Sequence, residues 1–328
     1  MTVRVLSTMR FEPAWLEAVA AVSDRVELRQ IAAESCDELP EDALREVEVL
    51  YTGSAFPRRD QAPALRWVQL DTSGADHVRG TPLWGSDVVI TSIGGISPRP
   101  IAEYVIAALL ALAHRLPRAA AGQRGHEWPS TAERWAWYRP VHVPGSRMAV
   151  VGYGSLGRSV ARAARAFGID VTGVRRGGSA RSYDDEPGGI DVVTAERLDD
   201  ALATADWVVV CVPRTPETTH LIGAAQFASM KPGAHLINVA RGGVVNEDAM
   251  LAALDSGRLA GAVLDVFDQE PLPPGSPLWE HPGVLLTPHI SGLASDYEQQ
   301  VRLLFRDNLA RYLEGRPLRN VIDRTLGY

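Results

Sequence analysis

The sequence predicts an α/β protein built from two doubly wound units, on three observations. The chain has 328 residues, more than a single hydrophobic core usually organises. Short runs rich in β-branched residues recur along it, and most are separated by stretches compatible with helices. These runs are almost continuously apolar, which is typical of parallel strands covered by helices on both faces. The predicted strands are residues 3–6, 47–51, 66–70, 88–91, 148–151, 171–174, 207–212, 235–239, 262–266 and 284–287.

The order of these runs indicates a domain boundary near residue 97. The first four strands form one group, after which residues 100–116 are expected to form a helix and residues 122–145 a loop. We therefore expect a first domain of residues 1–97 and a second that begins at residue 98.

Composition and charge exclude several classes of partner. Hydrophobic residues make up 46% of the chain and charged residues 22%, as in ordinary globular proteins. The net charge is −7 and the pI is about 5.7, so the chain as a whole has no electrostatic attraction for nucleic acids or anionic membranes. We expect neither as a partner.

The cysteines and the apolar segments indicate a cytoplasmic protein. Cys36 and Cys211 are the only cysteines, and Cys211 follows an apolar run, so a buried free thiol is favoured over a disulfide. The first ten residues lack the apolar core of a signal peptide. The longest apolar stretch, residues 101–113, is shorter than the ~18 residues that suggest a membrane span. We expect it to be a buried helix.

A glycine motif follows the strand predicted at residues 148–151. The sequence there is Gly152-Tyr153-Gly154-Ser155-Leu156-Gly157, and a helix is expected over residues 158–167. In such a turn the first glycine permits the bend, the second lets the backbone approach a pyrophosphate, and the third lets helix and strand pack closely. The helix N-terminus then favours the negative charge of the phosphates. The motif therefore predicts a dinucleotide site.

The end of the next strand indicates which dinucleotide binds. NAD-binding folds commonly place an acidic residue there, on the ribose 2′-hydroxyl, whereas arginine suits the 2′-phosphate of NADP. Arg175 and Arg176 occupy this position, at the start of a Gly- and Arg-rich loop that runs to Arg181. The nearest acid, Asp170, begins the strand and should point away from the ribose. NADP(H) is therefore favoured, and NAD(H) remains possible.

Further motifs resemble the D-isomer-specific 2-hydroxyacid dehydrogenase family, whose glyoxylate and hydroxypyruvate reductases are closest in character. They are GYGSLG at 152–157, RTPET at 214–218, INVARGGVVNE at 237–247, GAVLDVF at 261–267, EPL at 270–272 and TPH at 287–289. The resemblance covers essentially the whole chain and is strongest from about residue 145 to 293. It implies two Rossmann-like domains with the substrate between them. One is a flavodoxin-like substrate-binding domain of residues 1–97, completed by residues 290–328, and the other is an NAD(P)-binding domain of residues 98–289.

The resemblance also implies the catalytic residues. Arg241 corresponds to the family's substrate-binding arginine, Glu270 to the acid that orients a histidine, and His289 to the general acid/base. Reduction of a 2-oxo acid needs a proton donor, a cation for the carboxylate and carbonyl, and a hydride delivered from one side. All three side chains follow predicted strands, where ligands of open α/β sheets bind. A carboxylate beside His289 would favour its protonated form, which reduction requires.

The remaining site residues come from the same motifs. Ser73 and Gly74 resemble the segment whose backbone amides receive the substrate carboxylate, together with Arg241 and His289, while His77 nearby is expected to be structural. Asp265 is expected to contact the nicotinamide carboxamide. The residues expected to contact the cofactor are Gly152, Tyr153, Gly154, Ser155, Leu156, Gly157, Arg175, Arg176, Val212, Pro213, Thr218, Ala240, Arg241, Asp265 and His289.

Sequence alone leaves alternatives open. The expected activity is hydride transfer between NAD(P)H and C2 of a small 2-oxo or D-2-hydroxy acid. A dinucleotide-sensing binding protein related to corepressors and a phosphoglycerate dehydrogenase-like enzyme are the alternatives. No Cys, His or Asp cluster has metal-ligand spacing, so no metal is expected. Family resemblance suggests a homodimer, formed through the helix from Ile101 and the segment with Trp128, Trp135 and Trp137.

Overall fold

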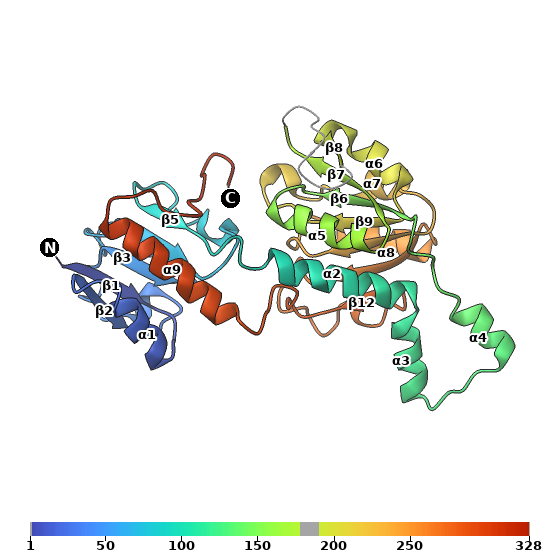
Figure 1. Ribbon diagram of the computed structural model, residues 1–328, viewed down its shortest axis with the longest axis horizontal. Coiled ribbons are helices and arrows are strands. Elements are labelled where there is room, and N and C mark those ends of the chain that lie inside the picture. The colour runs from blue at the N-terminus through green and yellow to red at the C-terminus, as the bar shows by residue number, and fades with distance from the viewer. Residues whose placement is uncertain (1, 178–189, 328) are drawn as a thin grey trace. The chain divides into compact units, whose positions relative to one another are not determined.

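The computed structural model describes residues 2–177 and 190–327 and divides the chain into two compact units. The first unit contains Met1–Ile96 and Ala294–Tyr328, and the second contains Ser97–Leu293. Each unit is built on one parallel sheet with helices packed against it (Figure 1). The predicted α/β class, with two doubly wound units, is confirmed.

The first unit has the strand order β2-β1-β3-β4-β5, which is the flavodoxin-like order. Its strands are β1 (Val3–Ser7), β2 (Val26–Gln30), β3 (Val49–Thr52), β4 (Trp67–Leu70) and β5 (Val89–Thr91). Helices α1 (Pro13–Ala20) and α9 (Tyr297–Leu313) pack on one face, where Trp15 and Phe305 stack with ring centroids 5.8 Å apart. The C-terminal helix therefore completes the core of the unit that the N-terminus begins.

The second unit has the strand order β12-β11-β10-β9-β6-β7-β8, a Rossmann order extended by one strand. Its strands are β6 (Arg147–Val151), β7 (Asp170–Arg175), β8 (Asp191–Thr194), β9 (Trp207–Val210), β10 (Ala234–Asn238), β11 (Leu259–Leu264) and β12 (Val284–Leu286). The sheet reverses its order between β6 and β9. Ligands of such sheets bind beyond the carboxyl ends of the strands at this reversal, which is where the glycine motif and Val212 lie.

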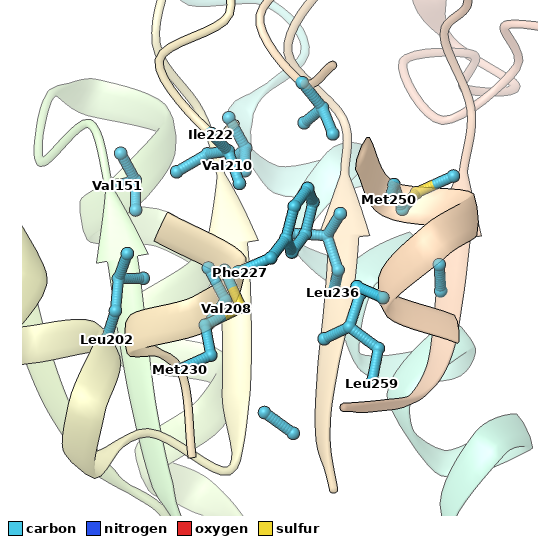
Figure 2. Close-up of a cluster of buried hydrophobic side chains, with 14 of the residues drawn as sticks. Val151, Leu202, Val208, Val210, Ile222, Phe227, Met230, Leu236, Met250 and Leu259 are labelled. Carbon is cyan, nitrogen blue, oxygen red and sulfur yellow. The ribbon is translucent and has the colours of Figure 1, made fainter. Parts of the chain in front are cut away.

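Helices cover both faces of this second sheet. Helices α2 (Pro98–Ala113) and α5 (Ser155–Ala166) pack on one face. Helices α6 (Leu198–Thr204), α7 (Ala224–Ser229) and α8 (Glu247–Asp255) pack on the other. Figure 2 shows the second of these cores, with Phe227 of α7 packed over the strands that carry Val208 and Leu236. The strands are consequently buried on both sides, as their continuous apolar runs indicate.

Several local predictions need correction. Strands β2 and β8 were not among the predicted strands. The expected helix over 100–116 is interrupted at His114 and Arg115, because Arg115 adopts a left-handed backbone with φ of 56°. The stretch 122–145 is not simply a loop, since α3 (Leu116–Arg124) runs into it and α4 (Thr131–Trp137) lies within it. Figure 1 shows α3 and α4 standing out from the second unit as a hairpin, named here the arm (residues 116–140).

The apolar stretch at 101–113 lies in α2, where Val105, Leu109 and other residues are buried, as expected. In the described ranges no single helix is long and apolar enough to cross a membrane, although α2 and α3, bent by 67°, meet the length and composition test as a pair. Both cysteines are free, and burial raises the pKa of Cys211 to about 12. The thiol therefore stays protonated at neutral pH.

Candidate active site

The glycine motif forms the turn between β6 and α5. Gly152 has a φ of 103°, and a Cβ there would lie 2.8 Å from backbone atoms of Cys211 and Val212. At Gly157 a Cβ would lie 2.1 Å from the carbonyl oxygen of Gly152, so this glycine lets the helix approach the strand. A Cβ at Gly154 would meet nothing within 4 Å. The turn thus leaves open space at the second glycine, at the N-terminus of α5, which fits a bound pyrophosphate.

The two glycines give a matched pair of predictions. Gly157→Ala should lower the melting temperature by several degrees, because overpacking against backbone typically costs ~1–3 kcal/mol. Gly154→Ala should leave the melting temperature nearly unchanged and weaken cofactor binding, since its methyl group would occupy the phosphate position. Differential scanning calorimetry and cofactor titration of both variants check this. A strongly destabilised Gly154→Ala would contradict the open space at this position. Unchanged cofactor affinity in that variant would contradict the assignment of the space to the cofactor.

Other predicted cofactor residues surround this turn. The ring of Tyr153 is buried and packs against Gly173, so its side chain belongs to the core. Arg175 ends β7 and Arg176 follows it, as expected, while residues 178–181 of the basic loop lie outside the described residues. Thr218 donates a hydrogen bond from Oγ1 to the carbonyl oxygen of Pro213 over 2.7 Å, which closes the loop after β9. Asp170 begins β7.

The predicted acid and histidine are in direct contact. Nδ1 of His289 lies 2.7 Å from Oε2 of Glu270, and the other carboxylate oxygen of Glu270 accepts from the backbone N–H of Phe267 over 3.0 Å. Both side chains are partly exposed. His289 has a φ of 54°, a left-handed backbone at the tip of the loop after β12. Because Nδ1 faces the carboxylate, Nε2 is the nitrogen left to exchange a proton with a ligand.

Asp265 holds the loop that carries His289. It is fully buried at the end of β11, where Oδ1 accepts from the hydroxyl of Thr287 and the N–H of Ile290. Oδ2 accepts from the N–H of Ser291 over 2.9 Å. A carboxylate has about four acceptor positions. Three of them therefore hold the residues on both sides of His289 in place.

Arg241 follows β10 and lies in a loop packed closely on the loop of Glu270. Its Nη1 donates to the carbonyl oxygen of Ala240 over 2.7 Å, and Ala240 N in turn donates to Oδ1 of Asn238. A Cβ on Gly242 would lie 1.7 Å from the carbonyl oxygen of Phe267. Phe267 also donates to Glu270, so the loop of Arg241 and the loop of Glu270 are in backbone contact within the second unit.

The predicted carboxylate-binding segment lies in the first unit, directly after β4. Oγ1 of Thr72 donates to the carbonyl oxygen of Gly74 over 2.7 Å and shapes this turn. Within residues 2–177 and 190–327, neither the N–H of Ser73 nor that of Gly74 has an acceptor. Both amides are therefore available to an anionic ligand. His77, in the next turn, lies beside Phe56 with ring centroids 5.5 Å apart.

Two residues beside these loops were missed by sequence reasoning. The hydroxyls of Tyr104 in α2 and Thr287 lie 2.5 Å apart, and Thr287 donates to Asp265, so Tyr104 donates to Thr287. In the first unit Asp71 precedes the turn of Ser73, and the hydroxyl of Tyr51 donates to it. Burial raises the pKa of Asp71. No sequence motif marks Tyr104, since its partner lies 183 residues away.

The chain matches one family model and many curated proteins. Residues 106–291 match the model described as D-isomer specific 2-hydroxyacid dehydrogenase, NAD binding domain. A glyoxylate reductase of Korarchaeum cryptofilum is 32% identical over 272 residues, which are 81% of this chain and 78% of that protein. A glyoxylate/hydroxypyruvate reductase B of Salmonella typhimurium is 33% identical over 264 residues, 80% of each chain.

Solved structures of other proteins are similar to this chain along its full length. A D-isomer specific 2-hydroxyacid dehydrogenase from Xanthobacter autotrophicus Py2, in complex with NADPH and MES, is 32% identical with a TM-score of 0.83 and covers 100% of this chain and 99% of its own. An NADPH-dependent glyoxylate/hydroxypyruvate reductase from Sinorhizobium meliloti, in complex with NADP and sulfate, is 28% identical with a TM-score of 0.81 and covers all of both chains.

Proposed function

This chain is an NAD(P)-dependent oxidoreductase of the D-isomer specific 2-hydroxyacid dehydrogenase family, and from that premise we propose that its substrate is glyoxylate or hydroxypyruvate. The observation that carries the proposal is the 2.7 Å contact between His289 and Glu270, which orients a proton donor beyond the carboxyl end of the sheet. The names of the curated relatives support this substrate class.

The roles of the residues follow from the chemistry of reduction. NADPH, when bound, supplies the hydride to C2 of the 2-oxo acid. His289 donates its Nε2 proton to the developing alkoxide, while Glu270 holds the ring by Nδ1. Arg241 supplies the cation that attracts the substrate carboxylate. The amides of Ser73 and Gly74 are proposed, from the family resemblance, to bind a carboxylate of the substrate. Asp265 fixes the histidine loop and is proposed, on the same resemblance, to contact the carboxamide of the cofactor.

We propose NADPH as the preferred cofactor, because Arg175 and Arg176 lie at the end of β7, where the ribose 2′ position is read. NADPH should give the higher kcat/KM, and Arg175→Asp should narrow or invert the preference through charge repulsion of the 2′-phosphate. Gly154→Ala serves as the comparison, since it should weaken both cofactors alike. Equal use of NADPH and NADH by the unmodified protein, with no change in Arg175→Asp, would contradict this.

A single substrate panel tests the proposed function. Glyoxylate, hydroxypyruvate, pyruvate and 3-phosphohydroxypyruvate are each assayed with NADPH and with NADH. The rate is followed as the decrease in absorbance of the reduced nicotinamide. Fastest turnover of glyoxylate or hydroxypyruvate supports the proposal. Preference for the phosphorylated substrate would favour the phosphoglycerate dehydrogenase-like alternative. Tight NADPH binding without turnover of any substrate would favour the dinucleotide-sensing alternative.

We also propose that the protein is a cytoplasmic homodimer. The arm carries Trp128, Trp135 and Leu116, whose side chains are 87%, 71% and 54% exposed. Exposed apolar side chains gathered on a projecting hairpin are typical of a protein interface. Two free cysteines accord with a reducing compartment. Light scattering of the unmodified protein and of Trp135→Glu tests the assembly, and a monomeric mass for both would contradict it.

A further inference from the structure

A pocket lies in the second unit at the amino-terminal ends of the strands, whereas the candidate active site lies at their carboxyl ends. His235 is at the start of β10, whereas Arg241 follows the end of the same strand. Around His235 is a cavity of about 590 Å³. Its walls come from the end of α2, both ends of the arm, and the loops at the starts of β11 and β12. Ligand pockets commonly have volumes of roughly 300–1,000 Å³.

His235 places an unsatisfied polar atom in the wall of this cavity. The side chain is 3% exposed, its ring stacks on Trp207 with centroids 4.4 Å apart, and its Nε2 is buried without a hydrogen-bond partner among the described residues. Buried polar groups nearly always have a partner, and each exception calls for a physical explanation. Because Nε2 has no accessible surface, it lies behind the wall of the cavity, and the imidazole forms a buried polar backing to the site.

Three arginines give the same cavity a positive charge. Arg115, Arg118 and Arg139 line it, and no acidic side chain in the described part of the chain pairs with any of them. The guanidinium of Arg118 lies over the ring of Trp137, 4.6 Å from its centroid. Burial, and then the charge of Arg115, lower the pKa of His235 to about 4. The positive charge at this cavity therefore disfavours protonation of the buried imidazole.

We propose that this cavity binds a small organic anion that carries two or more phosphate or carboxylate groups. Guanidinium groups bind both oxyanions through paired hydrogen bonds, and three of them match more than one charged group. Leu112, Val141 and Pro282 give the cavity apolar walls for a carbon skeleton. Because the glycine motif lies at the other end of the sheet, the anion should bind together with NADPH and not in competition with it.

The experiment measures anion binding to the full chain with NADPH already saturating, so that the glycine motif is occupied. Pyrophosphate and citrate are titrated separately by calorimetry at constant ionic strength. Both should bind in a one-to-one ratio to each chain, and the tighter probe identifies the phosphate or the carboxylate class. The double variant, Arg118→Ala with Arg139→Ala, should weaken anion binding by at least about tenfold, the effect expected for losing charge-assisted hydrogen bonds. Arg124→Ala, an exposed arginine of α3 outside the cavity, is the matched control and should bind as the unmodified protein does.

Three results would overturn the proposal. They are absence of binding once NADPH is saturating, equal affinity in the double variant, and equal loss in Arg124→Ala. A second measurement does not depend on variant stability. In protein with isotope-labelled histidine, pyrophosphate should shift the ring signals of His235, identified from the spectrum of His235→Asn, and leave those of His220 unchanged. Unshifted His235 signals at a saturating concentration of both probes would also reject the site.

Discussion

His289→Ala is expected to lower kcat for reduction of the 2-oxo acid by about 10²–10⁴-fold, the usual contribution of a positioned general acid. In the proposed mechanism the imidazole is the proton donor that Glu270 orients, so its loss should affect kcat far more than the affinity for NADPH. Because residue 289 has a left-handed backbone with φ of 54°, His289→Asn is the better second variant. Asparagine tolerates that conformation and lacks the proton donor. Both variants should lose rate while keeping the melting temperature close to that of the unmodified protein.

Glu270→Gln separates the charge of the acid from its shape. Glutamine keeps a hydrogen-bond partner for Nδ1 of the imidazole but removes the negative charge beside it. We therefore expect kcat for reduction to fall, by less than in His289→Ala, while the dissociation constant of NADPH stays nearly unchanged. Steady-state kinetics and an NADPH titration check this, and an unchanged kcat would show that the charge of Glu270 does not contribute to proton transfer.

Arg241→Ala is expected to reduce kcat/KM for the 2-oxo acid by roughly 10- to 100-fold, since hydrogen bonds to charged groups contribute about 1.5–3 kcal/mol. Most of this loss should appear in KM, because the guanidinium attracts the carboxylate in both ground state and transition state. The dissociation constant of NADPH should stay nearly unchanged. Lysine should restore little, since it lacks the planar pair of donors.

Steady-state kinetics and a separate NADPH titration distinguish the role of Arg241 from general damage. Loss of NADPH affinity in step with loss of turnover would indicate that the variant disturbs the cofactor site. A near-normal KM and kcat in Arg241→Ala would remove Arg241 from the substrate site altogether.

The fold was predictable where strands are buried on both faces. Runs such as Trp207 to Val210 are apolar throughout because helices cover both sides of the sheet. Strands β2 and β8 were missed because neither is a continuous apolar run, since charged and polar residues interrupt or bound both of them. In β2 the exposed Glu27 and Arg29 alternate with half-buried residues, a weaker signal than a continuous apolar run. Helix α4 did carry a readable signal, the capping box of Ser130 and Glu133.

The residues of the candidate site could be predicted where a short stretch of sequence contains a recognisable motif. The glycine motif and the pair of Glu270 and His289 each follow a strand and match a known pattern, so their residues could be named from the sequence. Tyr104 could not, because its contact with Thr287 depends on how α2 packs beside β12. The unsatisfied nitrogen of His235 was equally hidden, since burial and hydrogen bonding at one atom depend on packing that the sequence does not display.

The contact between Gly242 and Phe267 limits how the specificity of this protein can be altered by directed evolution. Any side chain at position 242 would overlap the carbonyl oxygen of Phe267, and the displaced segment would carry Glu270 with it. Libraries that randomise the neighbours of Arg241 should therefore keep position 242 as glycine. Since the turn after β4 is proposed to bind substrate, we expect variation placed there to change the substrate range without displacing Glu270.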